Sequence, residues 1–142
     1  MKNQPTRAEI ILMAGGAATV LFSFLAFYSY DTPIGSVNQN AWDTGLFPIA
    51  TYPALAGLIS GGVIALRRFA HVGFSARVGN YSWPQVHFLL GIFAGLIIAG
   101  YLVSDPGTAF GIGFWGMLAG TAALIIGAAM LANEPSGPRR LT

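Results

Sequence analysis

The chain has 142 residues, of which 54% are hydrophobic and 8% charged, with a formal net charge of +2 and no cysteine. Soluble domains carry about 25% charged residues, so this composition predicts an integral membrane protein whose surplus apolar surface faces lipid. The absence of cysteine excludes disulfides, thiolate metal sites and a cysteine nucleophile. The basic residues stand singly or in pairs and form no stripe, which argues against nucleic-acid binding.

Four apolar segments are long enough to cross a hydrocarbon core of about 30 Å, which takes about 20 helical residues. In chain order they cover residues 9–30, 45–69, 83–103 and 109–133. Helix is the expected state of each, because a backbone in lipid must satisfy its own hydrogen bonds and these runs lack the alternation of barrel strands. The predicted fold is an all-α bundle of four transmembrane helices, arranged as two helical hairpins in one domain.

Capping and turn residues mark several of the predicted ends. Asp43 is expected to cap the second helix, Ser82 the third and Asp105 the fourth. Pro53 lies inside the predicted second helix and is expected to kink it. The tight turn at residues 104–107 makes the third and fourth helices antiparallel neighbours.

All seven basic residues fall on one side of this four-segment pattern. They are Lys2 and Arg7 before the first segment, Arg67, Arg68 and Arg77 between the second and third, and Arg139 and Arg140 after the fourth. Short loops rich in Lys and Arg stay in the cytoplasm. We therefore predict a multi-pass plasma-membrane protein with both termini cytoplasmic, whose arginines mainly set its orientation and also contact lipid headgroups or a partner at the inner face.

Small residues recur along the second, third and fourth segments at helical spacing. In lipid, helices associate by close approach over such residues. We predict that these three helices pack closely over the following positions: Ala54, Gly57, Gly61, Gly91, Gly95, Gly116, Gly120 and Gly127. Packing within the bundle is favoured, and contact with further subunits is the alternative.

One histidine is a candidate polar site inside the membrane. His87 lies within the third segment, four residues before Gly91 and hence on its packing face. Intramembrane ionisable residues are candidate functional groups. A hydrogen-bonded or interfacial role is favoured over a proton relay or a quinone contact. The other histidine, His71, lies in a loop, which argues against haem held by two histidines.

Acids and aromatic rings gather at the predicted outer face. The candidate surface for a partner or ligand comprises Asp31, Trp42, Asp43, Asp105 and Trp115. Carboxylates beside aromatic faces suit a cation or an amine, although helix capping and an interfacial aromatic belt account for the same residues and are favoured. Three acids dispersed over two loops make no hard-metal site, so neither a metal nor a cofactor is predicted.

Two segments carry a family resemblance. Residues 40–48 (NAWDTGLFP) and 111–115 (GIGFW) resemble small, uncharacterised four-helix membrane proteins of actinobacteria, including the mycobacterial antigen-like family with a Pro/Gln/Tyr-rich tail. The resemblance implies four spans and an outer loop with tryptophan. It also implies a link to envelope or cell-division assemblies, with no catalytic residues. This chain stops nine residues after Asn133, so no role mediated by such a tail is expected.

The sequence contains no catalytic motif. The expected function is therefore non-enzymatic: an accessory or scaffold subunit of a larger plasma-membrane or envelope assembly, with lipid and other membrane subunits as partners. Two alternatives stay open. One is a small transporter or channel subunit, and the other is a quinone-contacting subunit of a respiratory complex.

Overall fold

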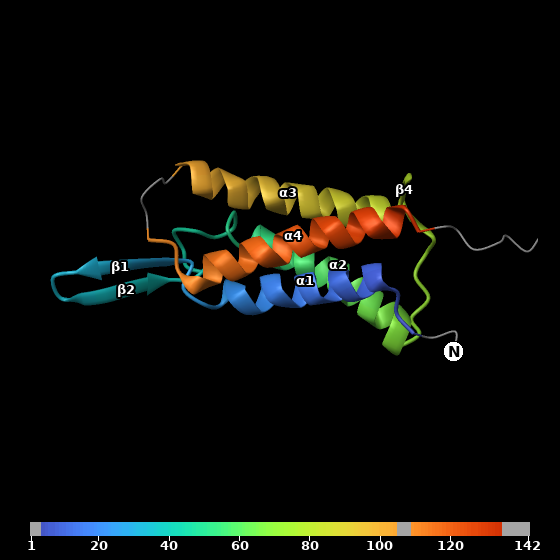
Figure 1. The fold of residues 1–142 in the computed structure, drawn as a ribbon, viewed down its shortest axis with the longest axis horizontal. Helices are drawn as coiled ribbons and strands as arrows, with labels where there is room; N and C mark the ends of the chain where they lie inside the picture. The colour runs from blue at the N-terminus through green and yellow to red at the C-terminus, as the bar shows by residue number, and fades with distance from the viewer. Residues whose placement is uncertain (1–3, 105–108, 135–142) are drawn as a thin grey trace, which may run out of the picture.

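The computed structural model describes residues 4–104 and 109–134, and within them four helices pack as a bundle (Figure 1). The helices are α1 (Arg7–Ser23), α2 (Tyr52–Phe69), α3 (Trp83–Ser104) and α4 (Ile112–Ala132). Two antiparallel hairpins connect them: β1 (Tyr28–Thr32) with β2 (Gly35–Gln39), and β3 (Arg77–Val78) with β4 (Tyr81–Ser82). The predicted helical bundle is confirmed, whereas the hairpins depart from the all-α expectation.

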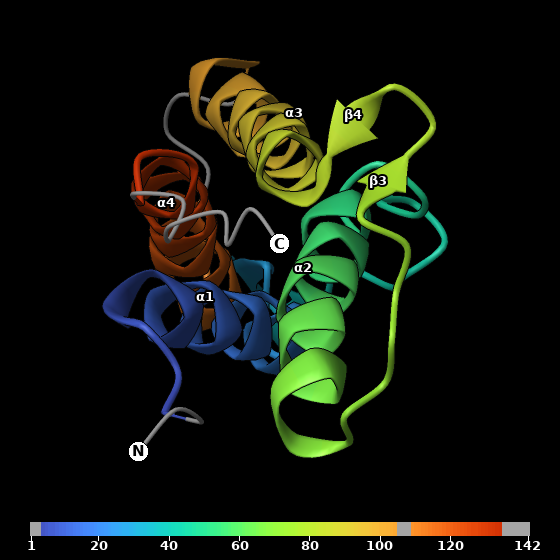
Figure 2. The same ribbon diagram turned by 90° about the vertical axis from the view of Figure 1, so that its right-hand side faces the viewer.

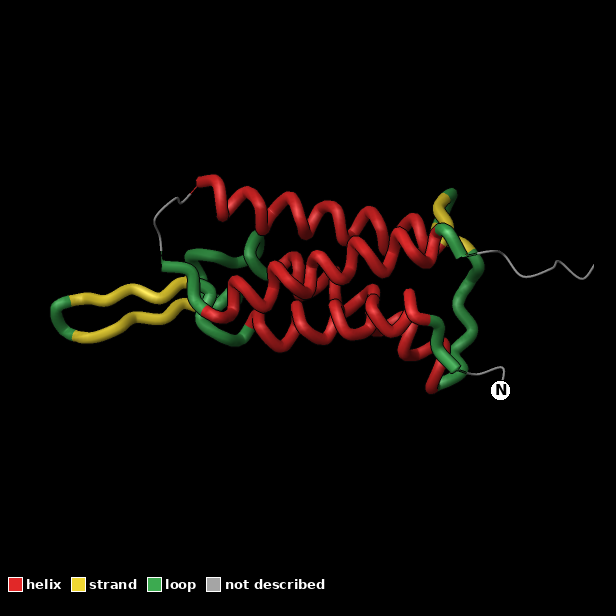
Figure 3. The backbone as a smooth tube through the Cα atoms, viewed as in Figure 1, coloured by secondary structure: helices red, strands yellow, loops and turns green. Residues whose placement is uncertain are grey.

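The helices form a ring in which α1 and α3 each lie between α2 and α4 (Figure 2). The β1–β2 hairpin projects along the bundle axis from one end, which we call the hairpin end (Figure 3). The other end holds the start of α1, the end of α2, the β3–β4 hairpin, the start of α3 and the end of α4. We call it the arginine end, after Arg7, Arg67, Arg68 and Arg77 in those elements.

The first helix is shorter than predicted and ends at Ser23 rather than at residue 30. Its start is fixed by a capping box in which Thr6 Oγ1 accepts from Glu9 N and Glu9 Oε2 accepts from Thr6 N. Beyond it, residues 28–32 pair with β2 instead of extending the helix. Aromatic and β-branched residues at alternate positions favour this strand.

The second helix begins at Tyr52 rather than at residue 45. The expected cap at Asp43 and the expected kink at Pro53 are therefore both wrong. Thr51 is the N-cap residue, and the carboxylate of Asp43 accepts from Asn40 N 2.8 Å away in the preceding turn. Pro53 lies in the first turn, where no intrahelical bond is lost, and therefore produces no kink.

The structure also shows how the last two helices begin. Ser82 N donates to Gln85 Oε1 at the start of α3, over 2.9 Å. The N-cap of α4 is Gly111, which has no side chain to accept a hydrogen bond. Asp105, the expected cap of the fourth helix, lies outside the described residues. Helices α3 and α4 are antiparallel neighbours, as predicted (Figure 1).

The packing centre of the bundle is α1. The prediction places the close contacts among the second, third and fourth helices and leaves the first helix out. A methyl group added at Gly15 would lie 2.8 Å from Gly120 O, and one at Gly120 would lie 2.8 Å from Thr19 N. On the other side, Gly16 of α1 faces Gly57 of α2. The backbone of α1 therefore touches two neighbouring backbones directly.

Of the described helices, α3 and α4 are long and apolar enough to cross a membrane. The α1 helix has 17 residues, and α2 carries Arg67 and Arg68 in its last turn. Two of the four predicted spans thus have the required length and composition as helices. In the other two, part of the predicted helix is replaced: a turn and the start of β1 follow Ser23 in the first, and turns occupy residues 45–51 at the beginning of the second.

Candidate functional site

The β1–β2 hairpin is the most distinctive feature of the surface. Its strands pair in register from Tyr28 with Gln39 to Thr32 with Gly35, which leaves residues 33 and 34 as the turn. Gly35 has a φ of 135°, a conformation that favours glycine. The side chain of Ile34 at the tip is 98% exposed. A two-stranded hairpin alone is marginally stable in water, so its base needs support from the bundle.

That support comes from backbone bonds and stacked rings. Ser29 N donates to Ala109 O over 2.9 Å, which joins β1 to the segment before α4. The Tyr28 ring stacks on Phe110 at 5.4 Å between centroids, and Phe110 stacks on Phe114 of α4 at 3.9 Å. The hairpin is therefore clamped to the end of the bundle, and its free half extends beyond it.

The hairpin has one apolar and one polar face. Tyr30 lies directly opposite Val37 on the first face, and Val37 is 46% exposed. On the other face Ser29 Oγ donates to Asn38 Oδ1 over 2.8 Å, and Asp31 lies opposite Ser36. Alternation along each strand produces this division.

The described residues of the predicted outer face belong to the hairpin end but do not form one site. Asp31 is exposed on the hairpin, while Asp43 is held in the turn at residues 40–43. Trp42 stacks on Phe24 at 5.4 Å, and its Nε1 donates to Ser23 Oγ over 2.9 Å. Trp115 is half-exposed beside Phe114 on α4. Asp105 lies outside the described residues.

The arginine end contains a bidentate ion pair. Arg68 Nε lies 2.9 Å from both carboxylate oxygens of Glu9, and Arg68 Nη2 lies 2.8 Å from Glu9 Oε2. The pair joins α2 to the first turn of α1. Glu9 therefore serves two purposes, as the capping-box partner of Thr6 and as the partner of Arg68.

The neighbouring Arg67 is enclosed by the loop before α3. Its guanidinium lies 4.9 Å from the ring centre of Trp83 and 5.5 Å from that of Phe74. Trp83 Nε1 donates to Ser75 O over 2.8 Å, which holds the loop against α3. Cation–π contact thus adds to the orienting role expected of Arg67. Arg77 is exposed in β3, and Arg139 and Arg140 lie outside the described residues.

His87 is buried, with 1% of its surface exposed, and its ring lies 5.6 Å from the ring of Trp83. No hydrogen-bond partner contacts its Nδ1 within the described residues, and the same holds for Ser60 Oγ and Thr121 Oγ1. These three polar groups come from α3, α2 and α4. The sequence singles out His87 alone, because serine and threonine are common in apolar helices.

The predicted packing residues lie at the helix contacts. Gly57 and Gly61 face Gly16 of α1, Gly91 and Gly95 face Ile125, and Gly116 faces the Phe22 ring. Gly120 meets Gly15 and Thr19, Gly127 meets Leu12, and Ala54 is buried. Gly15 and Gly16 share this packing, although the stripes along the later segments do not reveal them.

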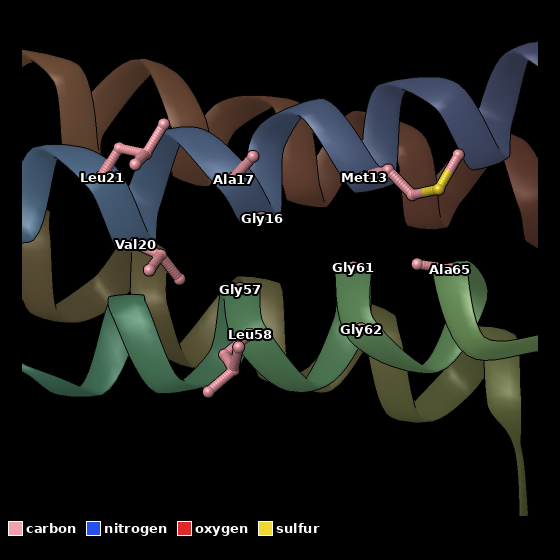
Figure 4. A pocket seen from close by; sticks show the side chains of 10 residues that line it. All are labelled: Met13, Gly16, Ala17, Val20, Leu21, Gly57, Leu58, Gly61, Gly62 and Ala65. Carbon is pink, nitrogen blue, oxygen red and sulfur yellow. The ribbon is translucent and has the colours of Figure 1, made fainter. Parts of the chain in front are cut away.

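An apolar groove of about 340 Å³ runs between α1 and α2 (Figure 4). Small residues of the two helices line its floor, with Met13, Val20, Leu21 and Leu58 around it. A methyl group added at Gly62 would touch nothing within 4 Å, so the groove is open there. Its lining side chains offer no hydrogen bond to a polar ligand.

Among residues 4–104 and 109–134, no group of three or more His, Asp or Glu side chains is placed to hold a metal ion. No protein-family model matches the chain, and no match is found among curated proteins or solved structures.

Proposed function

We propose that this chain is a non-enzymatic accessory or scaffold subunit of a larger plasma-membrane or envelope assembly. The observation that carries the proposal is the clamped hairpin with its projecting, 98% exposed Ile34. A projecting two-stranded hairpin offers its strand edges and its apolar tip to a partner protein. The resemblance of residues 40–48 and 111–115 to small actinobacterial membrane proteins points in the same direction.

In this proposal all four helices cross the membrane, with the arginine end in the cytoplasm. Leu21 and Phe24 of the α1 region and Leu58 of α2 are exposed, as lipid-facing residues would be. The 17 residues of α1 span about 25 Å, and the exposed Phe24 and Leu25 extend its apolar surface. The basic residues of the described chain gather at one end, as the rule for cytoplasmic loops requires.

The geometry gives less support to the alternatives. A transporter would need a polar path, whereas the groove between α1 and α2 is apolar. A quinone contact at His87 would need access to the imidazole, which is 1% exposed and packed beside Trp83. The helices instead provide a compact base for the hairpin.

Crosslinking followed by affinity purification from native membranes tests the proposal. The tagged full-length chain should recover one stoichiometric partner protein. Purification of the chain alone, both after crosslinking and in mild detergent, would contradict the accessory role. Ion or solute flux through liposomes that contain the chain alone would favour the transporter alternative instead.

A further inference from the structure

The outer edge of β1 is paired at its base, whereas the outer edge of β2 is open. Ser29 N donates to Ala109 O and Gly111 N donates to Phe27 O, so residues 109–111 pair with the start of β1 on the side that faces away from β2. In an antiparallel ladder, successive residues direct their backbone groups to opposite sides. By this alternation, Val37 directs its N–H and C=O towards β1, whereas Ser36 and Asn38 direct theirs away from it.

This open edge lacks the features that normally keep edge strands from pairing. Natural edges carry lysine, proline or a bulge, or are covered by another element. The β2 sequence Gly-Ser-Val-Asn-Gln contains no charge and no proline, and its register with β1 is continuous. Residues 35–38 are all exposed, and no backbone group of Ser36 or Asn38 has a partner beyond β1 within the described residues.

We infer that an extended segment of a different protein chain pairs with this open edge of β2 and adds a strand to the hairpin. The inference rests on the proposed function, since it names how the partner is bound. Strand addition draws affinity from main-chain hydrogen bonds and specificity from alternate side chains. The rings that clamp β1 to α4 hold the edge in place before the partner arrives, which lowers the ordering cost.

A second copy of this chain does not fit the edge. The hairpin runs along the bundle axis (Figure 1), so two copies inserted alike in one membrane would bring their β2 strands together in parallel. In a parallel pair of strands, consider a residue whose N–H and C=O point towards the other strand. The residue directly opposite it on that other strand has its N–H and C=O pointing away. A two-fold axis parallel to the strands would instead place Ser36 of one copy directly opposite Ser36 of the other, with the backbone groups of both pointing towards the contact. The symmetric contact therefore cannot form its hydrogen bonds.

The faces of the hairpin define the chemistry of the partner segment. Tyr30 and Val37 form an apolar face, and Ser29 and Asn38 form a polar one. A matching strand alternates apolar and polar residues, so that its apolar side chains continue the face of Val37. Such a segment belongs to the part of a membrane or envelope protein that lies outside the membrane.

Proline at the open edge provides a selective test. Ser36→Pro and Asn38→Pro each remove an N–H that points away from β1, so the hairpin itself keeps its ladder. Ser36→Ala and Asn38→Ala are the matched controls, because they change the side chain and keep the N–H. In affinity purification from native membranes, each proline variant should recover about tenfold less partner than its alanine control.

Hydrogen exchange at single amides supplies the second measurement. In the purified chain, Ser36 and Asn38 should exchange fast and Val37 slowly. In the purified complex, all three should be slow. This alternating pattern is the signature of a strand added at β2 and does not depend on how well the proline variants fold.

Each remaining outcome overturns a defined statement. Full recovery of the partner by both proline variants, or unchanged exchange at Ser36 and Asn38, would overturn strand addition and leave the accessory role intact. Equal loss in the alanine variants would place the contact on side chains and also overturn it. Recovery of only a second copy would overturn the choice of partner. Absence of any partner for the unmodified chain would overturn the proposed function itself.

Discussion

Helices α1 and α3 reach the same bundle by different means. The α1 helix has 17 residues and contacts α4 and α2 through glycine backbones. The α3 helix has 22 residues of higher hydropathy. Its Gly95 faces the flexible end of the Ile125 side chain, while Gly91 faces the same residue less closely than Gly15 and Gly16 face their neighbouring backbones. Of these two helices, α3 has the higher hydropathy and exposes more apolar surface. The α1 helix, at the packing centre, is distinguished instead by its two adjacent glycines.

The comparison is tested most sharply by asking whether the short α1 helix crosses the membrane as α3 is proposed to do. The chain has no cysteine, so single cysteines can be introduced at Gln4 before α1 and at Ile34 after it. We expect a membrane-impermeant maleimide to label Ile34→Cys in intact cells and Gln4→Cys only after permeabilisation. Ala76→Cys, before α3, and Val103→Cys, in its last turn, provide the matching pair. Equal labelling of Gln4→Cys and Ile34→Cys in intact cells would show that α1 does not cross.

The next largest effect is expected from a methyl group at the glycine contacts. In Gly15→Ala the new Cβ would lie 2.8 Å from the backbone oxygen of Gly120, which cannot move away alone. We expect a loss of about 1–3 kcal/mol in stability, measured as the free energy of unfolding in detergent. Gly95→Ala is the matched control, since its nearest neighbour is the terminal methyl of Ile125 at 3.1 Å. Similar losses in the two variants would remove the distinction between α1 and α3.

The number of helices and the neighbours α3 and α4 follow from hydropathy and a short connection. The hairpin does not, because Tyr28, Tyr30 and Thr32 extend an apolar run that is long enough to be read as helix. The alternation of Tyr-Ser-Tyr-Asp-Thr before Pro33 and Gly35 was the available signal for a strand and a turn. Gly15 and Gly16 are adjacent, so they lack the spacing by four that reveals packing stripes. The ion pair of Glu9 with Arg68 joins residues far apart in sequence, which no local pattern predicts.

A smaller effect is expected at the arginine end of α1, where Glu9 has two partners. Glu9→Ala removes the pair with Arg68 and the half of the capping box in which Glu9 Oε2 accepts from Thr6 N, and should cost about 1–2 kcal/mol. Glu9→Gln keeps a side-chain acceptor for Thr6 N but removes the charge, and should cost about half as much. Thermal unfolding in detergent measures both. If Glu9→Gln destabilises as much as Glu9→Ala, the ion pair rather than the cap holds this end.

The smallest change is expected at the buried imidazole of α3. The Nδ1 atom of His87 has no hydrogen-bond partner among the described residues, so an apolar side chain of similar volume removes an unsatisfied group. His87→Leu should leave stability within about 0.5 kcal/mol of the unmodified chain or raise it by up to about 1 kcal/mol, because the lost ring contact with Trp83 offsets part of the gain. The unfolding midpoint in detergent measures this difference. A clear loss of stability would contradict this expectation and would mean that the imidazole is stabilised where it lies. The interior beside α3 would then contain a polar interaction that the glycine contacts of α1 lack.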